Sequence, residues 1–151
     1  MPPRRSSPAR TLLLVEDNPG DARLIEEAFS PAVAEGLRVV SNGDEALDFV
    51  NRRGEYEGAR PPDLILLDWH LPGTDGEEVL AELNAHPNHG HVPVIVLTGS
   101  QSEREVRDSY VKNANACITK AADPDELEET LRAFEEFWLS AARLPRSDGG
   151  P

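Results

Sequence analysis

The chain has a single cysteine, few aromatic residues and no long apolar run, and these shortages exclude several classes of protein. One cysteine, Cys117, cannot form an internal disulfide. No hydrophobic stretch approaches the length needed to cross a bilayer, and the first ten residues, MPPRRSSPAR, lack the apolar segment of a secretory signal. We therefore expect a cytoplasmic protein with no membrane partner.

Positive charge is also scarce. The 15 Lys and Arg residues face 28 Asp and Glu residues, which gives a formal net charge of −13. Nucleic acid phosphates require a basic surface, so this balance argues against a nucleic acid partner. It is compatible with a divalent cation or with a basic protein surface as the partner.

Short apolar runs alternate with segments of helical periodicity along the whole chain. Residues 12–15, 64–67 and 94–97 are apolar at every position, which is typical of central strands in a parallel sheet. Two further runs lie at 37–40 and 116–119, and an amphipathic segment follows each of the five. Strict alternation of this kind predicts an α/β fold, a doubly wound five-stranded parallel sheet with five helices.

The ends of the domain and two helix starts can be placed from local composition. The segments 1–9 and 145–151 are rich in Pro, Gly, Ser and Arg, so we expect flexible tails around a domain of residues 10–144. Asn18 followed by Pro19 is a typical start for the first helix. The pair Asp123 and Pro124 gives the last helix the same start.

Polar residues stand where the predicted strands end. The first strand ends in Glu16 and Asp17, the third in Asp68, the fourth in Thr98 and the fifth in Lys120. In an open parallel sheet, ligands bind outside the carboxyl ends of the strands. We therefore expect three carboxylates, a hydroxyl and an ammonium to face one shallow crevice.

This set of groups suits phosphoryl chemistry. Neighbouring carboxylates repel one another unless a cation lies between them, and Mg²⁺ prefers such oxygen ligands. Lys120 would supply a second cation and Thr98 a hydrogen-bond donor for phosphoryl oxygens. Asp68 is the best placed nucleophile for an acyl phosphate, since it ends a central strand and the turn LPGTDG follows it closely.

At these residues the chain resembles the receiver domain of two-component response regulators. The resemblance covers roughly residues 10–140 and rests on Glu16–Asp17, on Asp68 with LPGTDG, on Thr98 and on Lys120, in that order. The stretches LLVEDNPGDARLIEEAF, NRRGEYEGARPP and FWLSAARLP are most similar to the stand-alone regulators that partner bacterial and cyanobacterial phytochromes.

The resemblance implies a flavodoxin-like sheet with strand order 2-1-3-4-5 and a role for each matching residue. Asp68 would accept a phosphoryl group from a phosphohistidine on a sensor histidine kinase, a bacteriophytochrome in the narrower resemblance. Thr98 and Lys120 would bind that group. Mg²⁺ would be held by Glu16, Asp17, Asp68 and the backbone carbonyl of His70. His70 and Ser100 occupy positions that tune the loss of phosphate.

Two positions depart from the family pattern. Receivers commonly have an aromatic residue three positions before the lysine, where this chain has Cys117, so the usual aromatic switch is in doubt. The lysine is commonly followed by proline through a cis bond, whereas Ala121 follows here. A cis bond without proline costs on the order of 3 kcal/mol, so the loop is either trans or strained.

The last helix has two apolar stripes. Leu127, Leu131, Phe134 and Trp138 have the spacing of a core-facing stripe, and Ala133, Phe137, Ala141 and Leu144 mark a second one beside it. A domain of this size needs one such stripe, so the second predicts a homodimer through the C-terminal helix. The alternative is a single broad stripe that packs on the core.

We interpret the chain as a phosphorylated signalling switch. Its output would run through protein contacts, a phosphorelay or use as a phosphate sink. One alternative is a hydrolase of small phosphoesters, although such enzymes have an acid two residues after the nucleophile, where this chain has His70. The other is an adaptor that is never phosphorylated, which would be expected to have lost an acid or the lysine.

Overall fold

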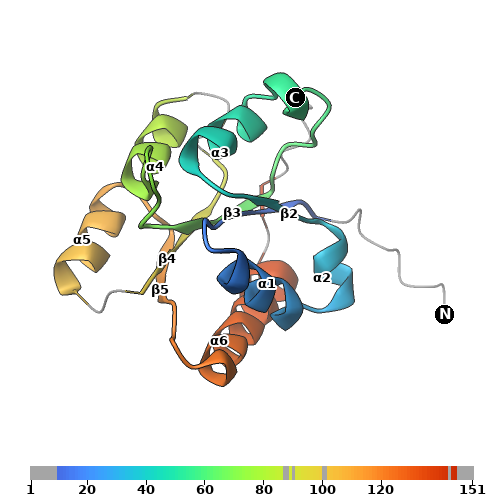
Figure 1. The fold of residues 1–151 in the computed structure, drawn as a ribbon, viewed down its shortest axis with the longest axis vertical. Helices are drawn as coiled ribbons and strands as arrows, with labels where there is room; N and C mark the ends of the chain where they lie inside the picture. Colours follow the sequence, from blue (N-terminus) through green and yellow to red (C-terminus); the bar gives the residue numbers. More distant parts are fainter. Residues whose placement is uncertain (1–9, 87–88, 90, 100–101, 143, 146–151) are drawn as a thin grey trace.

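The computed structural model describes residues 10–86, 89, 91–99, 102–142 and 144–145. In these residues a five-stranded sheet lies between two layers of helices (Figure 1). The strands are β1 (Leu12–Val15), β2 (Leu37–Val40), β3 (Leu64–Asp68), β4 (Val94–Thr98) and β5 (Ala116–Thr119). Their order is β2-β1-β3-β4-β5 and every pair is parallel, which confirms the predicted topology.

The described residues form more helices than the five that the sequence pattern predicts. The described residues form α1 (Pro19–Ala28), α2 (Pro31–Glu35), α3 (Gly43–Val50), α4 (Gly76–Ala85), α5 (Glu103–Val111) and α6 (Pro124–Glu136). The helix that the sequence pattern missed is α2, a single short turn that begins after Ser30, whose hydroxyl accepts a hydrogen bond from the Val33 N–H. It was missed because five residues are too few to show a periodic apolar pattern.

Two further turns are helical but do not have α-helical geometry. A 3₁₀ turn, η1 (Gly54–Tyr56), lies in the long connection between α3 and β3. After α6 the backbone widens into a π-helical turn, η2 (Phe137–Ala141), in which the N–H of Ala142 donates to the carbonyl of Phe137. The single long helix predicted for the C-terminal segment is therefore α-helical only as far as Glu136.

Both predicted helix starts are confirmed. The side chain of Asn18 accepts a hydrogen bond from the Asp21 N–H, and Pro19 opens α1. Asp123 caps α6 in the same manner through the Asp125 N–H. The cap of α1 sets the direction in which the chain leaves β1, directly beside the acidic strand end.

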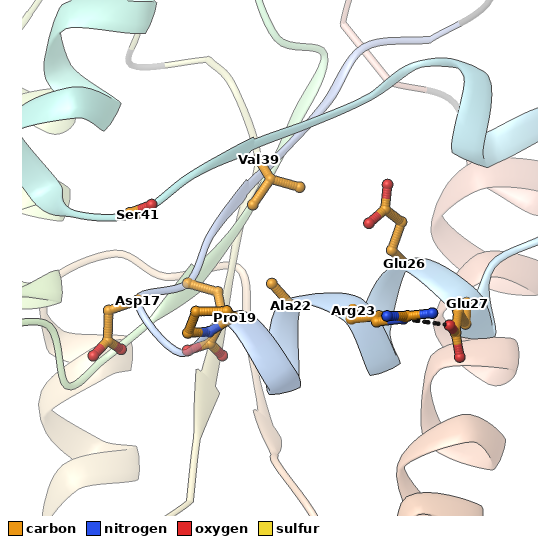
Figure 2. Close-up of a pocket in the computed structure, with 9 residues that line it drawn as sticks. Asp17, Pro19, Ala22, Arg23, Glu26, Glu27, Val39 and Ser41 are labelled. Atoms are coloured by element: carbon orange, nitrogen blue, oxygen red, sulfur yellow. Dashed lines mark hydrogen bonds and ion pairs between the residues drawn. The ribbon is translucent and has the colours of Figure 1, made fainter.

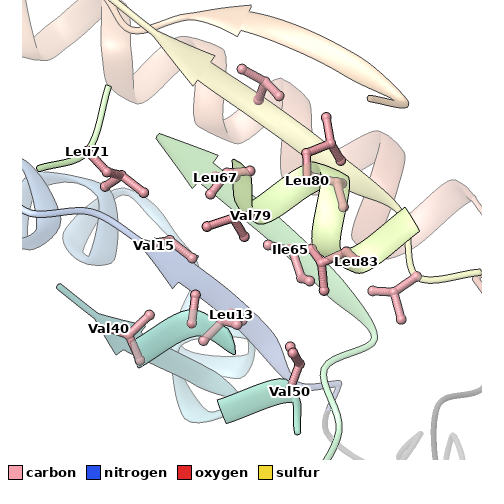
Figure 3. Packing of buried hydrophobic residues seen from close by; sticks show 14 of the residues in the cluster. Leu13, Val15, Val40, Val50, Ile65, Leu67, Leu71, Val79, Leu80 and Leu83 are labelled. Atoms are coloured by element: carbon pink, nitrogen blue, oxygen red, sulfur yellow. The ribbon is translucent and has the colours of Figure 1, made fainter. Parts of the chain in front are cut away.

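The core lies on both faces of the sheet because β1, β3 and β4 are buried at every position. Leu13, Val15, Ile65 and Leu67 pack with Val79, Leu80 and Leu83 of α4 on one face (Figure 3). The alternate residues of the same strands pack against α1 and α6 on the other face. Two covered faces leave the carboxyl edge of the sheet as the place where polar side chains can gather.

Among the residues that the structure describes, no helix is both long enough and apolar enough to cross a membrane. The tail predicted at 1–9, and all of the tail at 145–151 except Pro145, lie outside the described residues.

Candidate functional site

Three acidic side chains meet at the carboxyl edge of the sheet. Glu16 and Asp17 follow β1, and Asp68 is the last residue of the neighbouring strand β3. Each offers a carboxylate oxygen, and the three oxygens lie within 4.8 Å of one another. Glu16 and Asp68 are buried, whereas Asp17 is exposed. These donors are all hard oxygens, so they fit a divalent cation such as Mg²⁺.

Lys120 reaches into this cluster from the segment that follows β5. Its Nζ lies 2.5 Å from Glu16 Oε1 and 3.4 Å from Asp68 Oδ2. The backbone holds the lysine in place, since its N–H donates to the carbonyl of Thr98 at 2.7 Å. The predicted convergence of β1, β3 and the chain after β5 is therefore present as direct contacts.

The buried charges shift the pKa values of both partners. Burial raises the pKa of the Glu16 carboxyl to about 7; the hydrogen bond from Lys120 opposes this, and the charge of Asp68 adds to it. Burial alone would lower the pKa of the Lys120 ammonium, but its hydrogen bonds to Glu16 and Asp21 outweigh burial and raise it. At neutral pH the Lys120 side chain is protonated. The raised pKa of Glu16 leaves its carboxyl partly protonated at the same pH.

Asp68 is fixed by the turn that follows it. Its Oδ1 accepts a hydrogen bond from the His70 N–H at 3.1 Å. The chain then returns so closely at the start of α4 that a Cβ on Gly76 would lie 2.7 Å from the Asp68 carbonyl oxygen. Only glycine fits there without displacing backbone. The turn LPGTDG thus holds the end of β3 in place while the carboxylate faces Lys120.

Two further predicted residues, Thr98 and His70, lie at the same edge. Thr98 is buried at the end of β4, opposite Thr119 of β5. His70 follows Asp68 and its ring is exposed, and the metal-ligand role of its backbone carbonyl stays a prediction. Ser100, predicted to tune phosphate loss, lies outside the described residues.

The two departures from the family pattern have clear structural outcomes. Cys117 lies half-buried in β5, and its backbone N–H donates to the hydroxyl of Tyr110 from α5 at 3.3 Å. An aromatic ring thus adjoins this position from a neighbouring helix. The described backbone contains no cis peptide bond, so the bond between Lys120 and Ala121 is trans.

Sequence reasoning missed two contacts of this site. Asp21 Oδ2 lies 3.0 Å from Lys120 Nζ, a contact between residues far apart in the sequence. Glu105 of α5 lies with its Oε1 2.6 Å from His70 Nε2 and so joins the loop after Asp68 to that helix. No sequence pattern pairs Asp21 with Lys120 or Glu105 with His70.

A surface groove of about 540 Å³ opens beside the acidic cluster. In Figure 2 Asp17 stands at one end, Glu26 and Glu27 of α1 stand at the other, and Val39 of the edge strand β2 faces α1 across the gap. Arg23, the one cation among the described residues that line the groove, pairs with Glu27 at 2.9 Å. The approach to the cluster from this side is therefore acidic.

Comparison with known proteins agrees with this geometry. A family profile described as the response regulator receiver domain matches residues 12–132. Response regulator Rcp1 of Synechocystis sp. is 39% identical over 141 residues, which are 93% of this chain and 96% of that protein. The chain belongs to the response regulator receiver domain family.

Solved structures similar to this chain include phytochrome response regulators of that family. The phosphorylated cyanobacterial phytochrome response regulator RcpA is similar with a TM-score of 0.87 and 43% identity, over 92% of this chain and 100% of that one. The Mn²⁺-bound form of Rcp1 is similar with a TM-score of 0.85 and 38% identity, over 91% and 99% of the two chains. The chain is thus a receiver domain like those of phytochrome-associated response regulators.

Proposed function

We propose that Asp68 accepts a phosphoryl group from the phosphohistidine of a sensor histidine kinase. The observation that carries the proposal is the contact of Lys120 with both Glu16 and Asp68 in a cluster of three acids, within a chain of the receiver family. An Asp68 carboxylate oxygen bonds to phosphorus while the P–N bond of the phosphohistidine breaks. The imidazole nitrogen keeps the electron pair and takes up a proton.

Each neighbouring residue has a task in this transfer. The Lys120 ammonium lies within reach of the Asp68 carboxylate and pairs with the added phosphoryl charge. Thr98, buried at the end of the adjacent strand, donates its hydroxyl hydrogen bond to a phosphoryl oxygen. Beyond its own phosphotransfer and the loss of its own phosphate, the domain catalyses no reaction in this proposal.

Mg²⁺ is the proposed cofactor. Glu16, Asp17, Asp68 and the backbone carbonyl of His70 would hold it, and the proximity of the three carboxylates supports this choice. When bound, the ion neutralises negative charge on the phosphoryl oxygens. A relative in this family, Rcp1, has been crystallised in a form with Mn²⁺ bound.

The proposed partner is a sensor kinase of the phytochrome class, in the cytoplasm. The similarity to RcpA and Rcp1 supports this class. Signalling then proceeds by a change of conformation and of protein contacts, or by a phosphorelay or phosphate sink. The contact between His70 and Glu105 gives the site a direct connection to α5, whose position is then sensitive to the state of Asp68.

The test is Mg²⁺-dependent transfer of labelled phosphate from an autophosphorylated bacteriophytochrome kinase. Wild-type protein should become labelled, and Asp68→Asn should not. Asp44→Asn is the matched control, because Asp44 is an exposed carboxylate in the first turn of α3 whose one described contact is with Thr74. Labelling of Asp68→Asn would refute the acceptor. Turnover of a generic phosphoester substrate by the wild type would favour a hydrolase instead.

We also propose a homodimer through the C-terminal helix. Phe137 is 57% exposed and Ala133, one turn earlier, is exposed as well. The predicted second stripe is narrower than expected, since Leu144 packs against the core; the side chain of Ala141 is outside the described set. An exposed phenylalanine beside an exposed alanine favours a self-complementary contact.

Sedimentation at micromolar concentration tests this proposal. Wild-type protein should sediment as a dimer, and Phe137→Glu should shift it toward the monomer. Val111→Glu is the control, since Val111 is exposed as well but lies on a different helix, α5. A wild type that is monomeric throughout, or a dimer that Phe137→Glu leaves unchanged, would exclude this interface.

A further inference from the structure

The ammonium of Lys120 contacts three carboxylates, and one of them has no part in the function proposed above. Glu16 lies at 2.5 Å and Asp68 at 3.4 Å, while Asp21 of α1 lies at 3.0 Å. Asp21 is therefore a nearer partner of Lys120 than the proposed phosphoacceptor. It does not belong to the group of three acids that can share a metal ion.

The fold holds Asp21 in this position. It stands in the first turn of α1, and its backbone N–H donates to the capping side chain of Asn18 at 3.0 Å. Helical side chains lean toward the helix N-terminus, so the carboxylate is directed back toward the strand ends. The pair is only partly open to solvent, with the Lys120 side chain 15% exposed and that of Asp21 34% exposed.

We propose that Asp21 is a positioning residue that holds Lys120 on the α1 side of the site and competes for it with the group carried by Asp68. This inference rests on the proposed function, because the competitor is a phosphoryl group. An ammonium that turns toward phosphoryl oxygens on Asp68 must loosen its contact with Asp21. Asp21 thereby weakens the binding of a phosphoryl group and adds negative charge that repels it.

The contact itself can be tested without phosphorylation. The chain has two lysines, Lys112 and Lys120, so acetylation by an N-hydroxysuccinimide ester can be followed at each by mass spectrometry. Lys112 is an internal reference, since it is 45% exposed and lies 3.7 Å from Glu77. In Asp21→Asn the acetylation of Lys120 relative to Lys112 should rise about threefold, as expected for loss of a partly exposed ion pair. An unchanged ratio would overturn the inference.

The competition is tested with beryllium fluoride, which binds ionised aspartate and imitates a phosphoryl group. The intrinsic fluorescence of the protein, to which Trp69 next to Asp68 contributes, reports binding at saturating Mg²⁺. The dissociation constant should fall about threefold in Asp21→Asn and return toward the wild-type value in Asp21→Glu. Glu26→Gln removes the same charge from an exposed position of α1 and should change it less than about twofold.

Each outcome separates the two proposals. Equal tightening in Asp21→Asn and Glu26→Gln would leave only net charge as the cause and would overturn the positioning role. A wild type that binds no beryllium fluoride would overturn the proposed function, and the competition with it, whatever the reactivity of Lys120. Thermal unfolding of each variant confirms that the comparison is made between folded proteins.

Discussion

At the scale of single residues, Glu16 shows how the sheet changes the chemistry of a side chain. In the unfolded chain it is an ordinary carboxyl group, whereas in the fold its side chain is wholly buried next to Lys120 and Asp68. Burial and the neighbouring carboxylate raise its pKa from 4.5 to about 7. At a pH between these two pKa values, the folded protein therefore keeps a proton on Glu16 that the unfolded chain has lost.

This proton makes the metal-free protein more stable in mild acid. The contribution is complete below pH 4.5 and is lost as the pH rises through about 7. The difference between the pKa of Glu16 in the folded and in the unfolded protein corresponds to about 3 kcal/mol of unfolding free energy. Urea unfolding in the presence of a chelator at pH 5.5 and pH 8 should show a loss for the wild type that is much smaller in Glu16→Gln. Lys120 stays protonated in both states across this range and adds no slope.

Parallel pH profiles for the two proteins would contradict this account. They would mean that Glu16 remains ionised in the fold, with the Lys120 contact outweighing its burial.

At the scale of elements, the start of α4 sets the position of the phosphoacceptor. The helix begins at Gly76, whose Cα lies against the backbone of Asp68 and Trp69. A Cβ there would come within 2.7–2.9 Å of three backbone atoms, and backbone cannot move aside as a flexible side chain does. The contact between helix start and strand end therefore depends on a residue without a side chain.

Gly76→Ala should accordingly destabilise the protein by about 1–3 kcal/mol, the usual cost of overpacking, and should weaken Mg²⁺ binding because Asp68 shifts. Gly58→Ala is the matched control, since a Cβ on Gly58 meets nothing within 4 Å. Chemical unfolding and a Mg²⁺ titration measure both effects. A Gly76→Ala protein as stable as the Gly58→Ala control would show that the α4 start can move without cost.

At the scale of the whole molecule, the dominant fact is a net charge of −13. Part of that charge is concentrated at one edge of the sheet, where three carboxylates converge and an acidic groove adjoins them. General screening by salt relieves the repulsion over the whole surface, whereas a bound divalent cation acts only at this edge. The two effects can be separated by comparing ions at equal ionic strength.

Mg²⁺ should raise the melting temperature well beyond the effect of NaCl at the same ionic strength. At a concentration about 100 times the dissociation constant, the gain is about 2.7 kcal/mol, or roughly 5–10 °C for a domain of this size. Asp17→Asn should lose most of this gain, because Asp17 belongs to the cluster but is exposed and contributes little to packing. Equal effects of Mg²⁺ and NaCl would exclude a specific site.

The sequence by itself determined the five strands, the helices long enough to show an apolar period, and the residues that end the strands. Apolar runs such as 64–67 that alternate with amphipathic segments are typical of buried parallel strands, and parallel strands bring Asp17, Asp68 and Lys120 to one edge whatever the details of packing. Short-range rules also sufficed for the caps at Asn18 and Asp123, since each cap involves residues within three positions.

Only the tertiary structure decided which partner each charged group takes. Asp21 and Lys120 are 99 positions apart in the sequence, and His70 and Glu105 are 35 apart. No local pattern encodes such contacts, because they depend on how α1 and α5 pack against the sheet. The raised pKa of Glu16 and the narrow fit at Gly76 have the same origin, since burial and close backbone approach exist only once the layers are assembled.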